Sequence, residues 1–260
     1  MEVKRSSIQI AKDTVHALLM RELKTRFGAS KLGYFWALAE PVAQASIMAV
    51  LFTLIGKTSL SGVPVALFLI SGIMPFKAFS KTLTQLSSGI AANKALFSYR
   101  QVSPIDPIIT RLIIEVSTFF IVYIIILATM YWLGFEVWPQ DILALITASL
   151  LLLLLAFGLA LCISCAQLYW QDTGKLIGMV MTPMFFISGI FYCATMIPPK
   201  FWFLFTWNPI FHAIELSRDA FFVSYQTPVG SWGYLVLTSF AFTVLGLMLY
   251  RVNREKFVRL

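Results

Sequence analysis

The stretch ILALITASLLLLLLAFGLALCISCAQL, residues 142–168, contains no charged side chain and is long enough to cross a bilayer as one helix. A transmembrane helix needs about 20 mostly apolar residues. The whole chain follows the same trend, because 59% of its 260 residues are hydrophobic, only 12% are charged, and its mean hydropathy is +0.82. A soluble domain carries about 25% charged residues, so this chain lacks the polar surface needed to cover itself in water. The sequence therefore predicts an all-α membrane protein.

Further apolar segments of similar length lie on both sides of this stretch. The predicted spans lie near 33–56, 63–86, 108–133, 142–168, 177–196 and 231–250. Residues 1–32 mix Lys, Arg, Asp and Glu with no unbroken apolar core, so they do not resemble a secretory signal. The predicted organisation is a cytoplasmic leader at 1–32 followed by a single transmembrane domain at 33–260 with six spans.

The segment 197–225 is rich in aromatic residues but makes a poor span. Prolines interrupt it, and Glu215, Arg218 and Asp219 lie in its second half. A Lys, Arg or Asp costs about 2.5–3.5 kcal/mol at the centre of an inserting helix. Two short helical pieces separated by Asn208-Pro209, which enter the membrane and return to the same side, fit this pattern better. Such re-entrant backbone is stable only where it packs against protein or lines a cavity.

The basic residues predict the orientation of the chain. Most of them lie before the first span, near the loops after spans two and four, or after the last span: Lys4, Arg5, Lys12, Arg21, Lys24, Arg26, Lys31, Lys94, Arg100, Arg111, Lys175, Arg251, Arg254, Lys256 and Arg259. Only Lys57, Lys200 and Arg218 fall on the opposite side. Because cytoplasmic loops carry the excess of Lys and Arg, both termini are predicted to be cytoplasmic. Two ends on one side require an even number of crossings, which favours six spans and an outer hairpin at 197–225 over seven spans.

Residues 7–27 predict an amphipathic helix in the leader. Apolar residues recur at spacings of three and four from Ile8 to Phe27, with charged residues elsewhere around the turn. A basic amphipathic helix on the cytoplasmic side is expected to lie in the plane of the lipid headgroups. As a solvated helix it would expose its apolar stripe, so that alternative is disfavoured.

Motifs for catalysis or cofactor binding are incomplete in this sequence. Gly56-Lys57-Thr58 resembles the end of a phosphate-binding loop, but Leu51 stands where that loop needs its first glycine. Cys162 and Cys165 form a C-x-x-C pair inside a predicted span, where packing is favoured over redox chemistry because a redox pair needs a helix N-terminus and solvent. Two histidines on different segments do not suggest a metal site. We therefore expect no metal, no cofactor and no catalytic residue in this chain.

Lys77 and Lys81 are the strongest candidates for a substrate pathway. They lie four residues apart, on one face of the second span, and no carboxylate stands three or four residues from either. Charges inside a membrane usually face a bundle interior or an aqueous cavity and mark a pathway. One interpretation is a positive stripe for an anionic passenger. The other is that Lys81 reaches the membrane interface while Lys77 bonds to neighbouring helices.

Trp207, Glu215 and Arg218 in the outer hairpin are further pathway candidates. Glu215 and Arg218 are three residues apart and can pair on one helical face. Pinning the hairpin is the favoured role for this pair, ahead of substrate contact. Aromatic side chains can stack on sugar rings, but an aromatic belt at the membrane interface explains most of those in the hairpin.

Four longer patterns carry a resemblance to a known family. They are RELKTRFG at 21–28, LGYFWALAEP at 32–41, NKALFSYRQVSPID at 93–106 and WNPIFHAIELSRDA at 207–220. In content and order they resemble the permease subunit of bacterial ABC exporters for capsular polysaccharide, the KpsM-type branch of the type 2 ABC permeases. The similarity extends over essentially the whole chain.

The resemblance implies a homodimer bound to two separate ATPase subunits, which bind the ATP and Mg. It further implies export of a lipid-linked acidic polysaccharide across a Gram-negative inner membrane, towards periplasmic and outer-membrane components, with no role for nucleic acid. An O-antigen or teichoic-acid permease would share this plan. An intramembrane lipid-linked sugar transferase would need convergent acidic residues or a catalytic histidine, and a passive channel would not need a cytoplasmic coupling surface.

The resemblance also assigns a coupling helix to the loop at 93–106. Leu96, Phe97 and Tyr99 are bulky side chains suited to a groove on the ATPase, and Arg100 and Asp106 are expected to lock the loop. A loop packed against its own helix ends is the alternative, and it accounts well for Asp106.

The leader helix would rest on the ATPase or on lipid headgroups through Arg21, Glu22 and Arg26. Glu40, which precedes Pro41 early in the first span, has a simpler interpretation as a carboxylate neutralised by Arg21 or Arg26.

Overall fold

The computed structural model describes residues 7–28, 33–99 and 101–258. Its elements in chain order are α1 (Ser7–Gly28), α2 (Gly33–Leu54), β1 (Ser59–Leu60), β2 (Val63–Pro64), α3 (Val65–Ser87), η1 (Ala91–Ser98), α4 (Asp106–Trp132), α5 (Ile142–Gln167), α6 (Thr173–Ile187), η2 (Ala194–Met196), η3 (Pro199–Leu204), α7 (Pro209–Phe221) and α8 (Trp232–Val258). The strands β1 and β2 form one short antiparallel hairpin.

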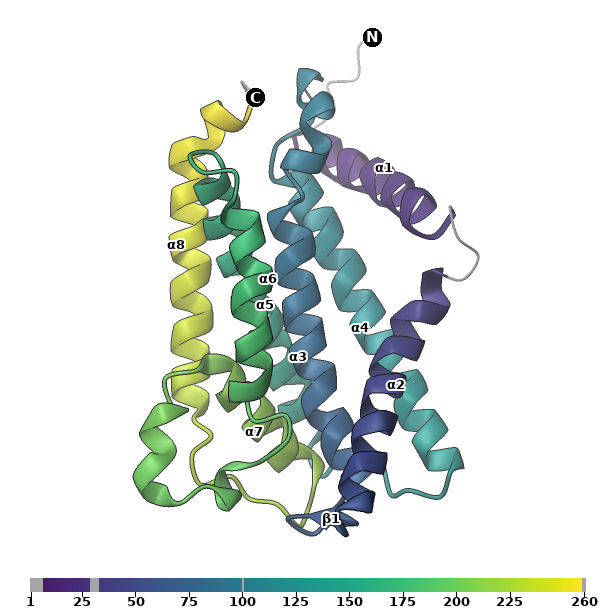
Figure 1. Ribbon diagram of the computed structural model, residues 1–260. Coiled ribbons are helices and arrows are strands. Elements are labelled where there is room, and N and C mark those ends of the chain that lie inside the picture. The colour runs from purple at the N-terminus through teal and green to yellow at the C-terminus, as the bar shows by residue number, and fades with distance from the viewer. Residues whose placement is uncertain (1–6, 29–32, 100, 259–260) are drawn as a thin grey trace.

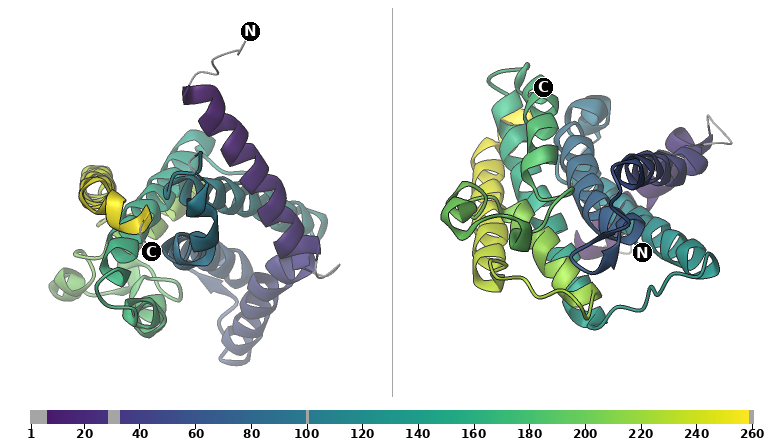
Figure 2. Two further views of the ribbon diagram at one scale, coloured as in Figure 1. Left: turned by 90° about the horizontal axis from the view of Figure 1, so that it is seen from above. Right: turned by 60° about the horizontal axis from the view of Figure 1, so that its bottom comes forward.

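The long helices run side by side as a bundle (Figure 1). The helix α1, the short helix η1 and the C-terminal end of α8 lie at one end, which we call the terminal end. The strands, η3 and α7 lie towards the opposite end, which we call the hairpin end. Seen from above in Figure 2, α1 crosses the terminal end instead of running along the bundle.

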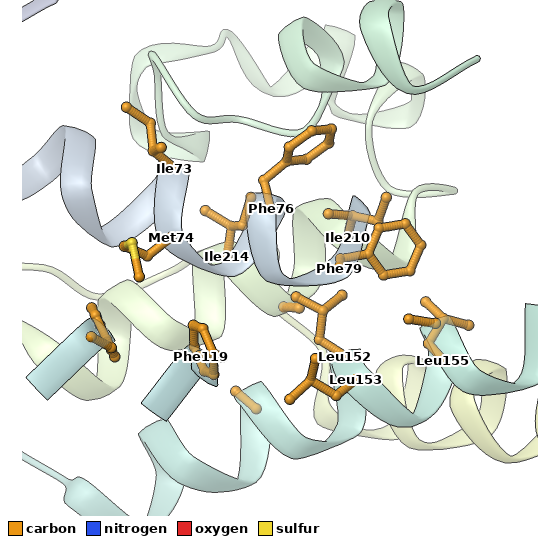
Figure 3. Packing of buried hydrophobic residues seen from close by; sticks show 14 of the residues in the cluster. Ile73, Met74, Phe76, Phe79, Phe119, Leu152, Leu153, Leu155, Ile210 and Ile214 are labelled. Carbon is orange, nitrogen blue, oxygen red and sulfur yellow. The ribbon is translucent and has the colours of Figure 1, made fainter. Parts of the chain in front are cut away.

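The helix α3 occupies the centre of the bundle and contacts α2, α4, α5, α6 and α7. Its first half is almost entirely apolar and buried, which suits a helix surrounded by other helices. Figure 3 shows Phe79 of α3 beside Ile210 of α7 and facing the leucines of α5, with Met74 of α3 near Phe119 of α4. The core of the protein is therefore built around α3.

The helices α5 and α8 approach each other at two glycines. An added Cβ on Gly158 would lie 2.5 Å from the backbone nitrogen of Thr243, and one on Gly246 would lie 2.5 Å from the Gly158 carbonyl oxygen. Small residues permit such backbone contact in membrane helix pairs. The hydroxyls of Ser239 and Thr243 donate to the α5 carbonyls of Leu151 and Leu154, at 2.9 and 3.2 Å.

The predicted helices are present, although the six crossings remain a prediction. Within the described residues, α4, α5, α8 and the segment Val65–Ser98 are long and apolar enough to cross a membrane, whereas Leu38–Leu54 and α6 are shorter apolar helices. The span predicted at 177–196 is wrong in its second half, because α6 ends at Ile187 and the backbone turns at Gly189 with φ of 76°. The helix α8 continues beyond the span predicted at 231–250, to Val258.

The segment predicted as an outer hairpin consists of two helical pieces, η3 and α7. They are separated at Asn208, whose side chain accepts a 2.9 Å hydrogen bond from the Ile210 N–H and caps α7. The helix α7 packs against α3, α5 and α8. The two-piece arrangement agrees with the expectation from the sequence, whereas its depth in a membrane remains a prediction.

The leader helix is present as α1, close to its predicted bounds. It packs mainly on α4, with Leu18 and Glu22 buried in the contact. A carboxylate thus belongs to the buried side of this helix, which the apolar spacing did not indicate.

Candidate functional site

A polar stripe runs along one face of α3 in its second half. Its members are spaced three or four residues apart and are Lys77, Ser80, Lys81, Thr84 and Gln85. They line a groove of about 640 Å³ between α3, α2 and α6. Across from the stripe, α2 contributes Glu40 and Gln44, and α6 contributes Met181, Thr182, Phe185 and Phe186. A polar groove in an apolar bundle is a candidate site for a hydrophilic ligand.

Lys77 forms an ion pair across this groove with Glu40 of α2. The two side chains are unequally exposed, at 27% for Lys77 and 70% for Glu40. The carboxylate that neutralises Lys77 thus comes from another helix. A search for carboxylates three or four residues away on the same helix does not find it. Of the two arginines expected to neutralise Glu40, Arg21 donates to Asn93, and the side chain of Arg26 lies outside the described residues.

Lys81 is exposed and has no ion-pair partner among the residues that the structure describes. Glu115 of α4 lies behind the two lysines, where it is 4% exposed and lines a smaller pocket of about 70 Å³ with them. The larger groove therefore contains two lysines and one carboxylate. Their roles towards a substrate remain predictions.

A second polar cluster, the Arg111 cluster, joins three helices at the terminal end. The Nε of Arg111 on α4 lies 2.9 Å from a carboxylate oxygen of Glu22 on α1. Its Nη1 donates to the Gln85 carbonyl at 2.7 Å and to the Ser88 hydroxyl at 3.0 Å, at the C-terminal end of α3. Arg111 and Glu22 are only 8% and 9% exposed. The leader helix is thus tied to the same helix that carries the polar stripe.

The loop predicted to contain a coupling helix is attached to α1 through Asn93. Arg21 donates to the Asn93 side-chain oxygen, and the Asn93 amide donates to the Gly89 carbonyl at 2.7 Å. The side chain of Arg26 and all of Arg100 lie outside the described residues. Their predicted roles therefore have no structural counterpart here.

The remaining loop residues differ in exposure. Phe97 is 7% exposed and belongs to the core, so the expectation that it fits a groove on a partner is wrong; its side chain packs inside the protein instead. Tyr99 is 64% exposed, and Leu96 is half-buried. The Asp106 carboxylate accepts a 2.8 Å hydrogen bond from the Ser103 N–H, which is the contact expected of a loop packed against its own helix end. A part for Asp106 in coupling remains a prediction.

Leu96 and Tyr99 also border a groove between the loop and α1. Its volume is about 460 Å³, and its α1 wall includes Asp13, Leu18 and Arg21. This groove is bordered by both the loop and the leader helix.

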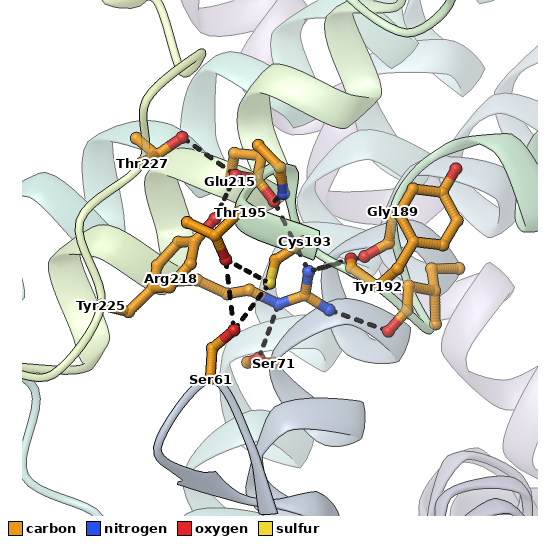
Figure 4. A network of polar contacts seen from close by, with 12 residues as sticks. Ser61, Ser71, Gly189, Tyr192, Cys193, Thr195, Glu215, Arg218, Tyr225 and Thr227 are labelled. Atoms are coloured by element: carbon orange, nitrogen blue, oxygen red, sulfur yellow. Dashed lines mark hydrogen bonds and ion pairs between the residues drawn. The ribbon is translucent and has the colours of Figure 1, made fainter. Parts of the chain in front are cut away.

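At the hairpin end, Arg218 of α7 is completely buried (Figure 4). Its guanidinium donates to the carbonyls of Gly189, Ile190 and Tyr192 at 2.6, 2.8 and 2.9 Å. It also lies over the Phe68 ring of α3, 3.8 Å from the centroid. One side chain therefore fastens α7 to α3 and to the turn that follows α6.

Glu215, also fully buried, lies 3.7 Å from Arg218 and accepts bonds from the other side. Its donors are the hydroxyls of Tyr225 and Thr227 and the backbone N–H of Ala194. Burial, followed by the charge of Glu215, raises the pKa of Tyr225, so the phenol stays protonated and donates. These contacts support the favoured role of pinning the hairpin over substrate contact.

Trp207 lies apart from both the lysine groove and the Arg218 cluster. Its indole N–H donates to the Leu204 carbonyl at 2.7 Å, and the side chain is 54% exposed. It borders an apolar groove of about 470 Å³ beside α6, α5 and α8. The three hairpin candidates therefore do not line the groove that contains Lys77 and Lys81.

His212 is a structural residue of the hairpin. Its Nδ1 accepts from the Ser231 N–H at 3.1 Å, so its Nε2–H donates to the Thr206 carbonyl at 2.8 Å. Burial lowers its pKa, which favours this neutral tautomer. Across residues 7–28, 33–99 and 101–258, no three His, Cys, Asp or Glu side chains are grouped as a metal site would need.

Comparison with known proteins identifies the family. The family model described as ABC-2 type transporter matches residues 14–222. The chain belongs to the ABC-2 type transporter family.

Relatives of this ABC-2 transporter chain match it over nearly its full length. It is 34% identical to the polysialic acid transport protein KpsM of Escherichia coli, over 96% of this chain and 97% of that protein. It is 27% identical to the capsule polysaccharide export inner-membrane protein BexB of Haemophilus influenzae, over 95% and 93%. It is 25% identical to the O-antigen export system permease protein RfbA of Klebsiella pneumoniae, over 95% of both chains. The resemblance found in the sequence motifs is confirmed.

Sequence reasoning missed the central residue of the Arg111 cluster in this ABC-2 transporter chain. Arg111 served only as evidence of orientation, and Asn93 only as the first letter of a motif. A signal was present, because an arginine one turn into a predicted span needs a partner. The partner, Glu22, lies 89 positions earlier in the chain and could not be paired with it by spacing alone.

Replacing Arg111 with glutamine is expected to loosen α1 in the ABC-2 transporter chain. Glu22 would lose its buried counter-charge, and a carboxylate left without one favours a solvated position. Limited trypsin digestion in detergent should then cut within α1 severalfold faster than in the wild type. Arg251→Gln, an exposed arginine on α8, is the control and should digest at the wild-type rate. Equal digestion of the wild type and Arg111→Gln would contradict the role given to this cluster.

Proposed function

We propose that the chain is the permease subunit of an ATP-driven exporter that moves a lipid-linked acidic capsular polysaccharide across the inner membrane of a Gram-negative cell. Membership of the ABC-2 type transporter family supports a transport role. The polymers named for KpsM and BexB support a capsular substrate. The observation that carries the proposal is the α3 stripe, because polar and cationic side chains within an apolar bundle mark a hydrophilic path.

Two copies of the chain would enclose the path in a homodimer. The groove lined by α2, α3 and α6 would face its counterpart, so that a hydrophilic polymer is shielded from lipid on both sides. The segments at 197–225 would close this cavity towards the periplasm. The rigid anchoring of α7 through Arg218 supports a closing rather than a ligand-binding role for them. Periplasmic and outer-membrane components would receive the polymer.

Two separate ATPase subunits would supply the energy, with ATP and Mg bound on them. The terminal end would face the cytoplasm, as the basic residues predict, with six spans in the membrane. Exposed Tyr99 and the groove between α1 and the loop would form the docking surface. The Arg111 cluster would connect that surface to α3.

An O-antigen exporter is the nearest alternative, favoured by the similarity to RfbA. The higher identity to KpsM favours the capsule assignment. A sugar transferase fits less well: Glu40 and Glu115 border one small pocket, but Lys77 and Lys81 line it with them and no histidine does. Glu215 is enclosed at the hairpin end, whereas Glu40 pairs with Lys77 in the groove.

Changing both Lys77 and Lys81 to glutamine tests the transport path. Surface polysaccharide should fall severalfold and polymer should accumulate inside the cell, because the groove loses both of its cations. Co-purification with the ATPase should persist, since neither lysine lies at the terminal surface. The matched control is the double variant Lys57→Gln/Lys200→Gln, which removes two exposed lysines outside the groove. Wild-type surface polysaccharide in the Lys77/Lys81 variant would overturn the proposed path.

A further inference from the structure

The groove contains a carboxylate that an acidic polymer would be expected to avoid. Glu40 is the negative group of the groove, and its side chain is the more exposed member of its ion pair with Lys77. A bare carboxylate there would repel an anionic passenger. Lys77 therefore has a task inside the protein, which is to neutralise Glu40.

Lys81 differs from Lys77 in this respect. It lies one helical turn away on the same face and lines the same groove. Among the described residues it has no ion-pair partner, and its side chain is exposed. Glu115, the other nearby carboxylate, is buried on the α4 side and does not line the groove. Among the described residues that line the groove, two lysines and one carboxylate leave one positive charge in excess in each chain, at Lys81.

We propose that Lys81 contacts the carboxylate or phosphate groups of the passenger, and that Glu40 sets the strength of this contact by occupying Lys77. The inference rests on the proposed function. It gives the two lysines different roles, with Lys81 contacting the passenger and Lys77 neutralising Glu40. A transport path must bind its passenger firmly enough to admit it and weakly enough to release it. With Lys77 occupied, each chain holds an anionic group through one cation instead of two. Glu40 is then a specificity-determining residue that keeps the binding weak.

Charge-neutralising variants test whether Lys81 in particular contacts the passenger or whether any positive charge in the groove is sufficient. Lys77→Gln leaves Glu40 bare, so export should fall severalfold. Adding Glu40→Gln removes the bare carboxylate and leaves Lys81 in place, so the double variant Glu40→Gln/Lys77→Gln should recover most of the export. The matched variant Glu40→Gln/Lys81→Gln has the same net charge as Glu40→Gln/Lys77→Gln but lacks the lysine that contacts the passenger. It should export much less polymer than Glu40→Gln/Lys77→Gln.

Glu40→Gln alone should tighten binding, because both lysines become free. Acidic polymer should co-purify with the transporter complex in severalfold larger amounts than with the wild type, while surface polymer falls. Glu136→Gln, in an exposed loop, is the control and should leave both amounts unchanged. The charge-swapped variant Glu40→Lys/Lys77→Glu retains an ion pair and leaves Lys81 in place. It should therefore export polymer at close to the wild-type level.

The assay uses cells that naturally carry this chain, with the chromosomal copy deleted and each variant supplied on a plasmid. Surface and intracellular polymer are separated on gels and stained with a cationic dye that detects acidic polysaccharide. Equal recovery by the two Glu40 double variants would overturn the assignment to Lys81. A Glu40→Gln/Lys77→Gln variant no better than Lys77→Gln would overturn the role of Glu40. If the Lys77/Lys81 double variant exports normally, the proposed path itself is wrong, and this inference falls with it.

Discussion

Arg218→Met is expected to remove much of the folding stability of the chain. The guanidinium is fully buried and satisfies three backbone carbonyls, and it is the counter-charge of buried Glu215. Removing one partner of a buried ion pair costs about 3–5 kcal/mol, because the remaining charge loses its compensation. Unfolding free energies of whole domains are about 5–15 kcal/mol, so a loss of this size removes much of the stability. The expected result is little or no monodisperse protein after detergent extraction and gel filtration.

Two further variants show whether the geometry or only the charge of Arg218 matters. Arg218→Lys keeps the charge but cannot donate to three carbonyls from one planar group, so it should also be unstable. Glu215→Gln keeps an oxygen that accepts from Tyr225 and Thr227, and its loss of thermal stability should be smaller. Lys200→Gln, on the surface of the same segment, is the control. A normal yield and melting temperature for Arg218→Met would show that the buried network does not hold the hairpin end together.

Gly158→Leu is expected to separate α5 from α8 while both helices remain in the membrane. An added Cβ alone would lie 2.5 Å from the Thr243 nitrogen, and backbone atoms cannot move aside as a flexible side chain can. Moving α8 away would also break the hydroxyl bonds from Ser239 and Thr243 to α5. Overpacking a close-packed interior costs about 1–3 kcal/mol, and more where the backbone must shift. The melting temperature in detergent should fall sharply, and proteolysis at the C-terminal end should accelerate.

Gly178→Leu provides the matched control for this prediction. Gly178 is also a helix residue, in α6, but an added Cβ there meets no heavy atom within 4 Å. The same change in side-chain volume should therefore leave the melting temperature close to the wild-type value. Similar destabilisation by the two substitutions would refute the close-contact explanation and point to a general effect of leucine on the helices.

The sequence was informative about helices because length and hydropathy are local properties. The predicted span 142–168 corresponds to α5, and 108–133 corresponds to α4 within a few residues. The end of α6 could not be predicted in this way, because the residues after Ser188 remain apolar while the chain turns at Gly189. The extension of α8 was missed for the opposite reason, since its last turns are basic and helical.

The candidate site was predictable only where the interacting groups share one helix. The spacing of Lys77 and Lys81 identified their common face, and the spacing of Glu215 and Arg218 identified their pairing. Glu40 is 37 residues from Lys77 in sequence, and their pairing depends on how α2 packs against α3. The burial of Phe97 likewise depends on the direction in which η1 turns, which no pattern of hydrophobic residues specifies.

The helix α3 is held near both ends by arginines from other helices. Arg218 contacts Phe68 and Ser71 near its first turns, and Arg111 binds Gln85 and Ser88 at its last turn. Between these fixed points lies the lysine-bearing section, with Pro75 inside the helix at its start. The anchors at both ends oppose sliding of α3 along its own axis. Movement of α1, which reaches α3 through Glu22 and Arg111, should therefore reorient the lysine-bearing section between the anchors without lengthening or shortening the path.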